Sequence, residues 1–143
     1  MKTNKLLVFG GLLILSSSVF SDGATIFYRD ASGGITKESR QHASAMHKIA
    51  DKQGYVTLWL LFDLPFNEAM HTMTEDELAE HKIFVANYAD DVLGTLVDTN
   101  QVWHPKAGPL VAGLGCNVRA TPQGLSNLLK EKRIIQIVSV DNQ

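Results

Sequence analysis

The strongest hydrophobic pattern lies in the middle of the chain. Tyr55–Leu64 is a run of β-branched, aromatic and aliphatic residues, interrupted only by Asp63, and Pro65 follows it. This composition predicts a strand buried on most of both faces. Next, Thr74 and Glu77 have the spacing of a helix capping box, and apolar residues then recur at helical spacing up to about Val97. The middle of the chain therefore predicts a central strand followed by a long amphipathic helix.

The C-terminal third shows two more strands, a helix and a last strand. A short strand around Gln101–His104 leads through a Pro/Gly turn into the strand Leu110–Val118. Thr121 then caps the helix Pro122–Lys130, and a β-branched run, Ile134–Val140, forms the last strand. The order from the central strand onward is β-α-β-β-α-β. Right-handed crossovers place both helices on one face of a four-stranded antiparallel sheet, which is the ferredoxin-like arrangement of an α+β protein.

The first 21 residues have the pattern of a secretory signal peptide. Lys2 and Lys5 precede the apolar stretch Leu6–Leu15, and small residues lead to a cleavage site after Ser21. The apolar stretch is short for a membrane span. We therefore expect a secreted or periplasmic protein whose mature form is not inserted in a membrane.

Between the leader and the central strand lies a less specific segment. It contains a β-prone run, Ala24–Tyr28, a turn signal at Gly33-Gly34, and a plausible helix, Glu38–Gln53, that Gly54 ends. The predicted divisions are a signal peptide (1–21), an N-terminal extension with a short hairpin and a helix (22–54), and one domain (55–143).

Charge and side-chain chemistry exclude several classes of function. Removing the leader takes away two of the thirteen Lys and Arg residues and none of the fifteen Asp and Glu residues, so the mature net charge is −4. This negative net charge argues against a nucleic-acid partner. His42 and His47 lack the spacing of a metal pair, and no Ser or Cys lies in a nucleophile motif. We expect no metal, no cofactor and no enzymatic activity.

Cys116 is the only cysteine of the chain, and we expect it to be buried and inert. Two alternatives stay open: a disulfide between two chains, or a reactive thiol.

One face of the predicted sheet is a candidate docking surface. Trp59 and Phe62 are three residues apart, so they lie on opposite faces of the central strand, and at least one aromatic side chain points away from the helices. Such a face binds a partner if it is exposed. The alternative is that residues 22–53 cover it. Gly113 and Gly115 are two residues apart and leave one face of their strand without side chains. This favours close packing of a helix on that face over a bend of the strand.

Four segments together resemble a known family: GYVTLWLLFDLPF, a helix from His81-Lys82 to Leu96, HPKAGPLVAGLGCNV, and ATPQGLSNLLKEKRIIQIVSVD. Their order and apolar positions, over residues 55–141, resemble the propeptide domain of subtilisin-family serine proteases and the stand-alone inhibitors related to it. The resemblance implies that the sheet docks on two helices of the protease and that the C-terminal tail lies in the substrate cleft. The implied binding residues are, in the tail, Val140, Asp141, Asn142 and Gln143, and, on the sheet face, Trp59, Phe62, Leu114, Gln136 and Val138.

The resemblance implies a non-enzymatic inhibitor or folding helper of a subtilisin-like serine protease. No protease domain follows in this chain, so the action would be in trans. The alternative is a ferredoxin-like protein-binding module with an unrelated partner, or a homodimer formed through the open sheet. An acylphosphatase-type enzyme shares the topology but needs an Arg-bearing phosphate loop after the first strand, where this chain has Pro65–Glu68.

Overall fold

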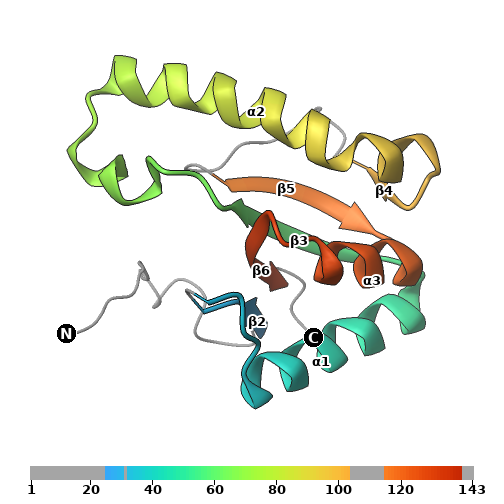
Figure 1. The fold of residues 1–143 in the computed structure, drawn as a ribbon. Helices are drawn as coiled ribbons and strands as arrows, with labels where there is room; N and C mark the ends of the chain where they lie inside the picture. The colour runs from blue at the N-terminus through green and yellow to red at the C-terminus, as the bar shows by residue number, and fades with distance from the viewer. Residues whose placement is uncertain (1–24, 31, 104–114, 140–143) are drawn as a thin grey trace.

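The computed structural model describes residues 25–30, 32–103 and 115–139. They form one five-stranded antiparallel sheet with the strand order β2-β6-β3-β5-β4, together with three α-helices (Figure 1). The strands are β2 (Thr25–Tyr28), β3 (Val56–Phe62), β4 (Val102–Trp103), β5 (Gly115–Ala120) and β6 (Ile134–Ser139). The helices are α1 (Lys37–Gln53), α2 (Glu75–Asp98) and α3 (Pro122–Lys130), with a short 3₁₀ helix, η3 (Asn67–Thr72). The α+β class is confirmed, and the sheet has one strand more than the four that the sequence predicted.

The additional strand, and the third helix that packs on the sheet, come from the segment predicted as an N-terminal extension. Strand β2 pairs with β6, so that Phe27 lies opposite Ile137 and is buried in the core. Helix α1 ends at Gly54, whose φ of 91° is the left-handed conformation that glycine adopts at low cost. The predicted helix is confirmed, and the prediction of a four-stranded sheet is wrong because β2 covers the edge of β6.

All three helices cover the same face of the sheet. Along β3, fully buried and half-buried residues alternate. The predicted burial of most of both faces is therefore complete on one face and partial on the other. The core joins β3 to the helices through side chains with no exposed surface: Val56, Leu58, Leu60 and Phe62 of β3, Met46 and Ala50 of α1, Val85, Ala89 and Leu93 of α2, and Leu125 and Leu128 of α3. We call this the helix face and the opposite one the outer face.

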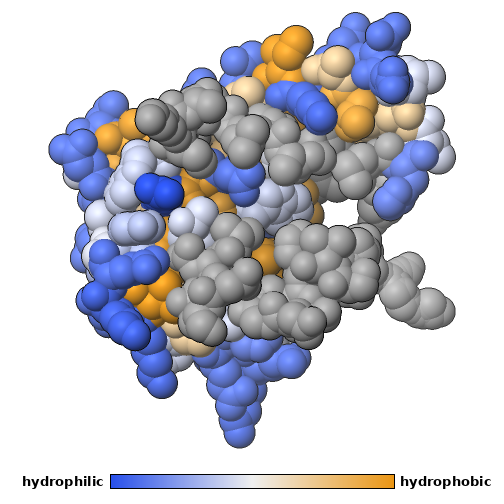
Figure 2. Space-filling model, turned by 180° about the vertical axis from the view of Figure 1, so that it is seen from behind, coloured by the Kyte–Doolittle hydropathy of each residue, from blue (hydrophilic) through white to orange (hydrophobic). Residues whose placement is uncertain are grey.

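Helix α2 begins with the predicted capping box. The Thr74 hydroxyl accepts from the Glu77 amide at 3.1 Å, and the Glu77 carboxylate accepts from the Thr74 amide at 2.8 Å. In Figure 1 the N-terminal half of α2 reaches past the end of the sheet, and in Figure 2 this region, at upper right, shows hydrophobic beside hydrophilic surface. Ile83 and Phe84 lie there with 65% and 50% of their surface exposed.

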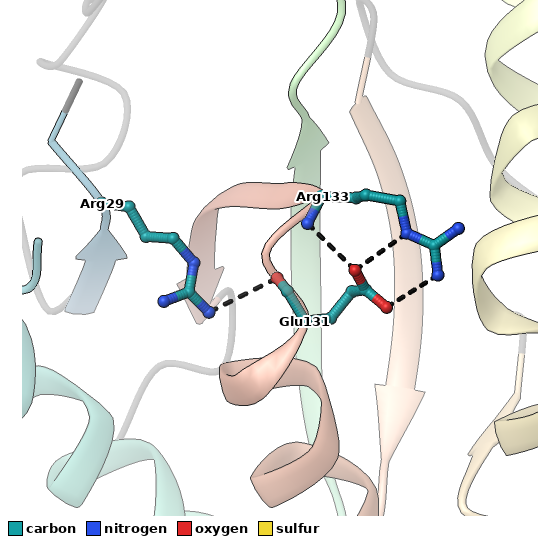
Figure 3. A network of polar contacts seen from close by, with 3 residues as sticks. All are labelled: Arg29, Glu131 and Arg133. Atoms are coloured by element: carbon teal, nitrogen blue, oxygen red, sulfur yellow. Dashed lines mark hydrogen bonds and ion pairs between the residues drawn. The ribbon is translucent and has the colours of Figure 1, made fainter. Parts of the chain in front are cut away.

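A polar network ties the N-terminal strand to the turn between α3 and β6 (Figure 3). The Arg29 guanidinium donates to the backbone oxygens of Leu129, Glu131 and Ile134, the last at 3.2 Å through Nε. The Glu131 carboxylate accepts two hydrogen bonds from the Arg133 guanidinium, at 2.8 and 2.9 Å. These bonds hold the pKa of the Glu131 carboxyl below its ordinary value. Arg29 thus satisfies the Leu129 carbonyl at the C-terminal end of α3 and shares the Glu131 carbonyl with the Ile134 amide.

Several predicted features lie outside the described residues. They are the signal peptide (1–21), the Pro/Gly turn and first half of the strand predicted at 110–118, Gly113, Leu114, and the tail Val140–Gln143. In the part of the chain that the structure describes, no helix has the length and apolarity needed to cross a membrane.

Candidate functional site

The outer face of the sheet is the surface that the sequence marked for docking. The strand register brings Trp59 of β3 between Asn117 of β5 and Val138 of β6. The described residues whose side chains share this face are Ile26, Tyr28, Thr57, Trp59, Leu61, Trp103, Gly115, Asn117, Arg119, Gln136 and Val138. The described helices all pack on the other side, so α1 does not cover this face. Figure 2 looks at the molecule from behind, where hydrophobic surface lies between hydrophilic side chains.

The structure separates the residues predicted for the sheet face. Trp59, Gln136 and Val138 share the outer face, where Trp59 and Gln136 are half-buried and Val138 has no exposed surface. The assignment of Phe62 to a docking face is wrong. Its side chain is fully buried on the helix face, where its ring meets Tyr88 edge-on with centroids 5.5 Å apart. The physical reason is the odd spacing from Trp59, which forces the two rings to opposite sides of the strand.

The indole of Trp59 explains why residue 115 is glycine. A Cβ atom built on Gly115 would lie 2.2 Å from two carbon atoms of the Trp59 ring. The indole therefore lies directly over the backbone of the neighbouring strand, where only a hydrogen atom leaves enough room. The expectation that a helix packs against this glycine is wrong, because an aromatic side chain of the same sheet fills the space.

A second aromatic group lies at the β4 side of the outer face. The guanidinium carbon of Arg119 lies 4.9 Å from the centroid of the Tyr55 ring, which is the geometry of a cation–π contact. The Tyr55 ring meets Trp103 edge-on, with centroids 6.1 Å apart. Sequence reasoning missed this group, although its signal was visible: Arg119 is a charged residue inside a strand that is otherwise uncharged.

Comparison of the chain with protein-family models, with curated proteins and with solved structures found no match. We therefore interpret the outer face from the residues of this chain alone.

The edge of the sheet at β2 is closed by side chains of α1. Nδ1 of His42 lies 3.1 Å from the Ile26 amide nitrogen and 2.6 Å from the Ile26 carbonyl oxygen, and the Tyr28 amide donates to the Ser39 hydroxyl at 3.2 Å. These two amides point away from β6 and would otherwise be free to pair with another strand. A partner that adds a strand would have to break both bonds, so the outer face, rather than this edge, is the better surface for binding.

Other polar groups do not assemble a reactive site among the described residues. Nε2 of His47 lies 3.5 Å from the Ser126 hydroxyl, the outer limit of a hydrogen bond, and no described carboxylate is hydrogen-bonded to this histidine. No group of three or more His, Cys, Asp or Glu in the described ranges could hold a metal ion.

A hollow of about 430 Å³ lies between α2 and α3 on the helix side of the sheet. Its lining includes Val92, Leu96, Asn127 and Arg133.

Cys116 is expected to be unreactive in the folded protein. Its side chain has no exposed surface, and burial, with a smaller effect of the Asp90 charge, raises the pKa of the thiol from 9.0 to about 12. At pH 8 such a shift lowers the thiolate fraction on the order of a thousandfold. We expect a disulfide exchange reagent such as Ellman's reagent to label the protein at pH 8 only after urea is added. Fast labelling of the native protein would contradict the burial of this thiol.

Proposed function

We propose that the protein is a non-enzymatic inhibitor, or intermolecular folding helper, of a subtilisin-like serine protease, exported by its N-terminal leader. The outer face docks on the protease, and the tail Asp141–Gln143 enters the substrate cleft. An extended tail in a cleft gains main-chain hydrogen bonds as an added strand, while side-chain pockets give specificity.

The observation that carries the proposal is the composition of the outer face. Its aromatic and aliphatic side chains come mainly from β3 and β6, with Trp59, Leu61 and Val138, and from the flanking strands β2 and β4, with Ile26, Tyr28 and Trp103. Strands β3 and β6 belong to the segments whose sequences resemble subtilisin propeptides. No described helix covers them, and partly exposed aromatic side chains such as Trp59 and Trp103 on an uncovered sheet face favour a protein partner. The last of these strands, β6, ends at Ser139, directly before the tail in the sequence.

The strand order supports the ferredoxin-like interpretation of residues 55–143. Strand β5 lies between β3 and β4, the two strands that α2 joins, and β3 lies between β5 and β6, the two strands that α3 joins. Two interleaved split β-α-β units are the basis of a ferredoxin-like sheet. In this proposal β2 and α1 are additions at the β6 edge.

A rival function is a homodimer, or another protein-binding module, that uses the same outer face. It is favoured by the same apolar composition, because a second copy of the sheet could cover it. Light scattering distinguishes the two: a stable dimer that buries the outer face leaves no surface for a protease.

The test is to titrate the mature chain, residues 22–143, into subtilisin-like proteases freed of their own propeptides. We expect inhibition of the hydrolysis of a chromogenic peptide, and deletion of Asp141–Gln143 should weaken it by at least about tenfold through loss of the cleft contacts. The melting temperature should stay unchanged. Ile83→Ser on α2 is the matched control, since this exposed residue lies away from the outer face. No inhibition, no complex and no faster recovery of denatured protease would reject the proposal.

A further inference from the structure

Arg119 stands apart from every other strand residue in the described sheet. The five strands read TIFY, VTLWLLF, VW, GCNVRA and IIQIVS, and Arg119 is the only charged residue in them. It lies on the outer face, opposite Thr57 on one side and Trp103 on the other. Its side chain is exposed. The outer face is thus neutral along its strands except for one cation.

The described surroundings of Arg119 orient its charge through aromatic rings. The guanidinium lies over the Tyr55 ring at 4.9 Å, and the Tyr55 ring rests edge-on against Trp103. A cation–π contact restricts the arginine side chain but leaves its hydrogen-bond donors available. No carboxylate of the described residues forms an ion pair with it. Within the described residues, Arg119 is therefore a positioned cation on an aromatic support, with no described carboxylate as its ion-pair partner.

Acidic side chains gather elsewhere in the molecule. Helix α2, on the other side of the sheet, carries seven acidic residues and one lysine. The whole mature chain has a net charge of −4. An acidic partner would therefore gain little from long-range attraction to this protein. An anionic group that binds the outer face must instead meet Arg119 at short range.

Docking would place Arg119 in an interface and remove its water. A buried, unpaired guanidinium is costly, whereas a carboxylate facing it can accept two parallel hydrogen bonds. We infer that the protease surface receiving the outer face presents an Asp or Glu side chain to Arg119, and that this ion pair selects among subtilisin-like proteases. The inference rests on the proposed function and names the chemistry of the partner at that site.

The experiment compares four variants with the wild-type protein against a panel of propeptide-free, catalytically inactivated subtilisin-like proteases. Arg119→Glu reverses the charge, Arg119→Gln removes it, and Arg119→Lys keeps it without the planar donor fork. Lys48→Glu, an exposed position on α1, makes the same change in net charge away from the outer face. Dissociation constants come from titration calorimetry, and circular dichroism checks that each variant is folded.

We expect Arg119→Glu to weaken binding by at least about 30-fold and Arg119→Gln by at least about tenfold, while Lys48→Glu stays within about twofold of wild type. Arg119→Lys should lie between wild type and Arg119→Gln. Replacing the opposing protease carboxylate by Lys should restore binding to Arg119→Glu. If Arg119→Glu does not fold, Arg119→Gln decides the question.

Two results would overturn the inference while leaving the proposed function intact. One is equal weakening by Arg119→Glu and Lys48→Glu, which would show only long-range repulsion. The other is wild-type binding by Arg119→Gln, which would show that no native ion pair exists. If no protease in the panel binds the wild-type protein, the proposed function fails, and this inference fails with it.

Discussion

Gly124→Ala is expected to lower the free energy of unfolding by about 3 kcal/mol, which is the upper range for overpacking a well-packed site. A Cβ atom at this position would lie 2.1 Å from the backbone oxygen of Gln101 and 2.8 Å from its carbonyl carbon. Backbone atoms cannot move aside by a change of rotamer. The same carbonyl accepts the Thr121 amide at 2.9 Å, so it is held in place from the start of α3. Urea denaturation followed by far-ultraviolet circular dichroism measures the effect.

Gly94→Ala is the matched control for this substitution. Gly94 also lies within a helix, α2, but a Cβ atom there would meet no atom within 4 Å. Alanine should therefore stabilise the protein by about 0.5–1 kcal/mol, because it restricts the unfolded chain and favours the helix. Equal stabilities for the two alanine variants would show that α3 does not pack against the Gln101 backbone as described.

Phe62→Ala should lower the free energy of unfolding by about 3–5 kcal/mol, while Trp59→Ala should cost clearly less. The two residues belong to the same strand but to opposite faces. Phe62 is fully buried against Tyr88, whereas Trp59 is half-buried on the outer face. Stability is measured by urea denaturation of both variants. The proposed protease inhibition, measured below the unfolding transition, should weaken only for Trp59→Ala.

Phe62→Leu serves as the control for volume, since leucine fills part of the space that alanine leaves empty. It should retain most of the stability that Phe62→Ala loses. A larger loss of stability from Trp59→Ala than from Phe62→Ala would contradict the assignment of the two faces.

The helices could be predicted because their boundaries are set by local signals. Thr74 and Glu77 form the capping box, Thr121 accepts the Gly124 amide, and Gly54 ends α1 in the left-handed conformation. Each of these interactions joins residues that are close in the sequence. The pairing of β2 with β6 has no such signal, since a β-prone run does not specify which edge it joins. The fifth strand was therefore missed even though its β-prone residues were recognised.

The candidate site was predictable to a similar extent. Period-two alternation already separates Trp59 from Phe62, and the error was to assign both to one surface. The role of Gly115 depends on the side-chain rotamer of Trp59, which places the indole over the Gly115 backbone. The spacing of residues in the sequence does not predict that rotamer. The contact between Arg119 and Tyr55 also joins distant parts of the chain, although the isolated charge in a strand could have drawn attention to it.

The contact of Arg29 with the backbone of Ile134 spans 105 residues of the chain. Strand β2, the first described strand of the sheet, therefore cannot pair until β6, the last strand, is present. Loop-closure entropy opposes the pairing of β2 with β6 until the strands between them in sequence have formed the core of the sheet. During synthesis, the N-terminal part of the chain has no partner for β2 until residues 134–139 have left the ribosome. Until then the N-terminal part of the chain stays without its place in the sheet, a state compatible with the export that we expect from the sequence of residues 1–21.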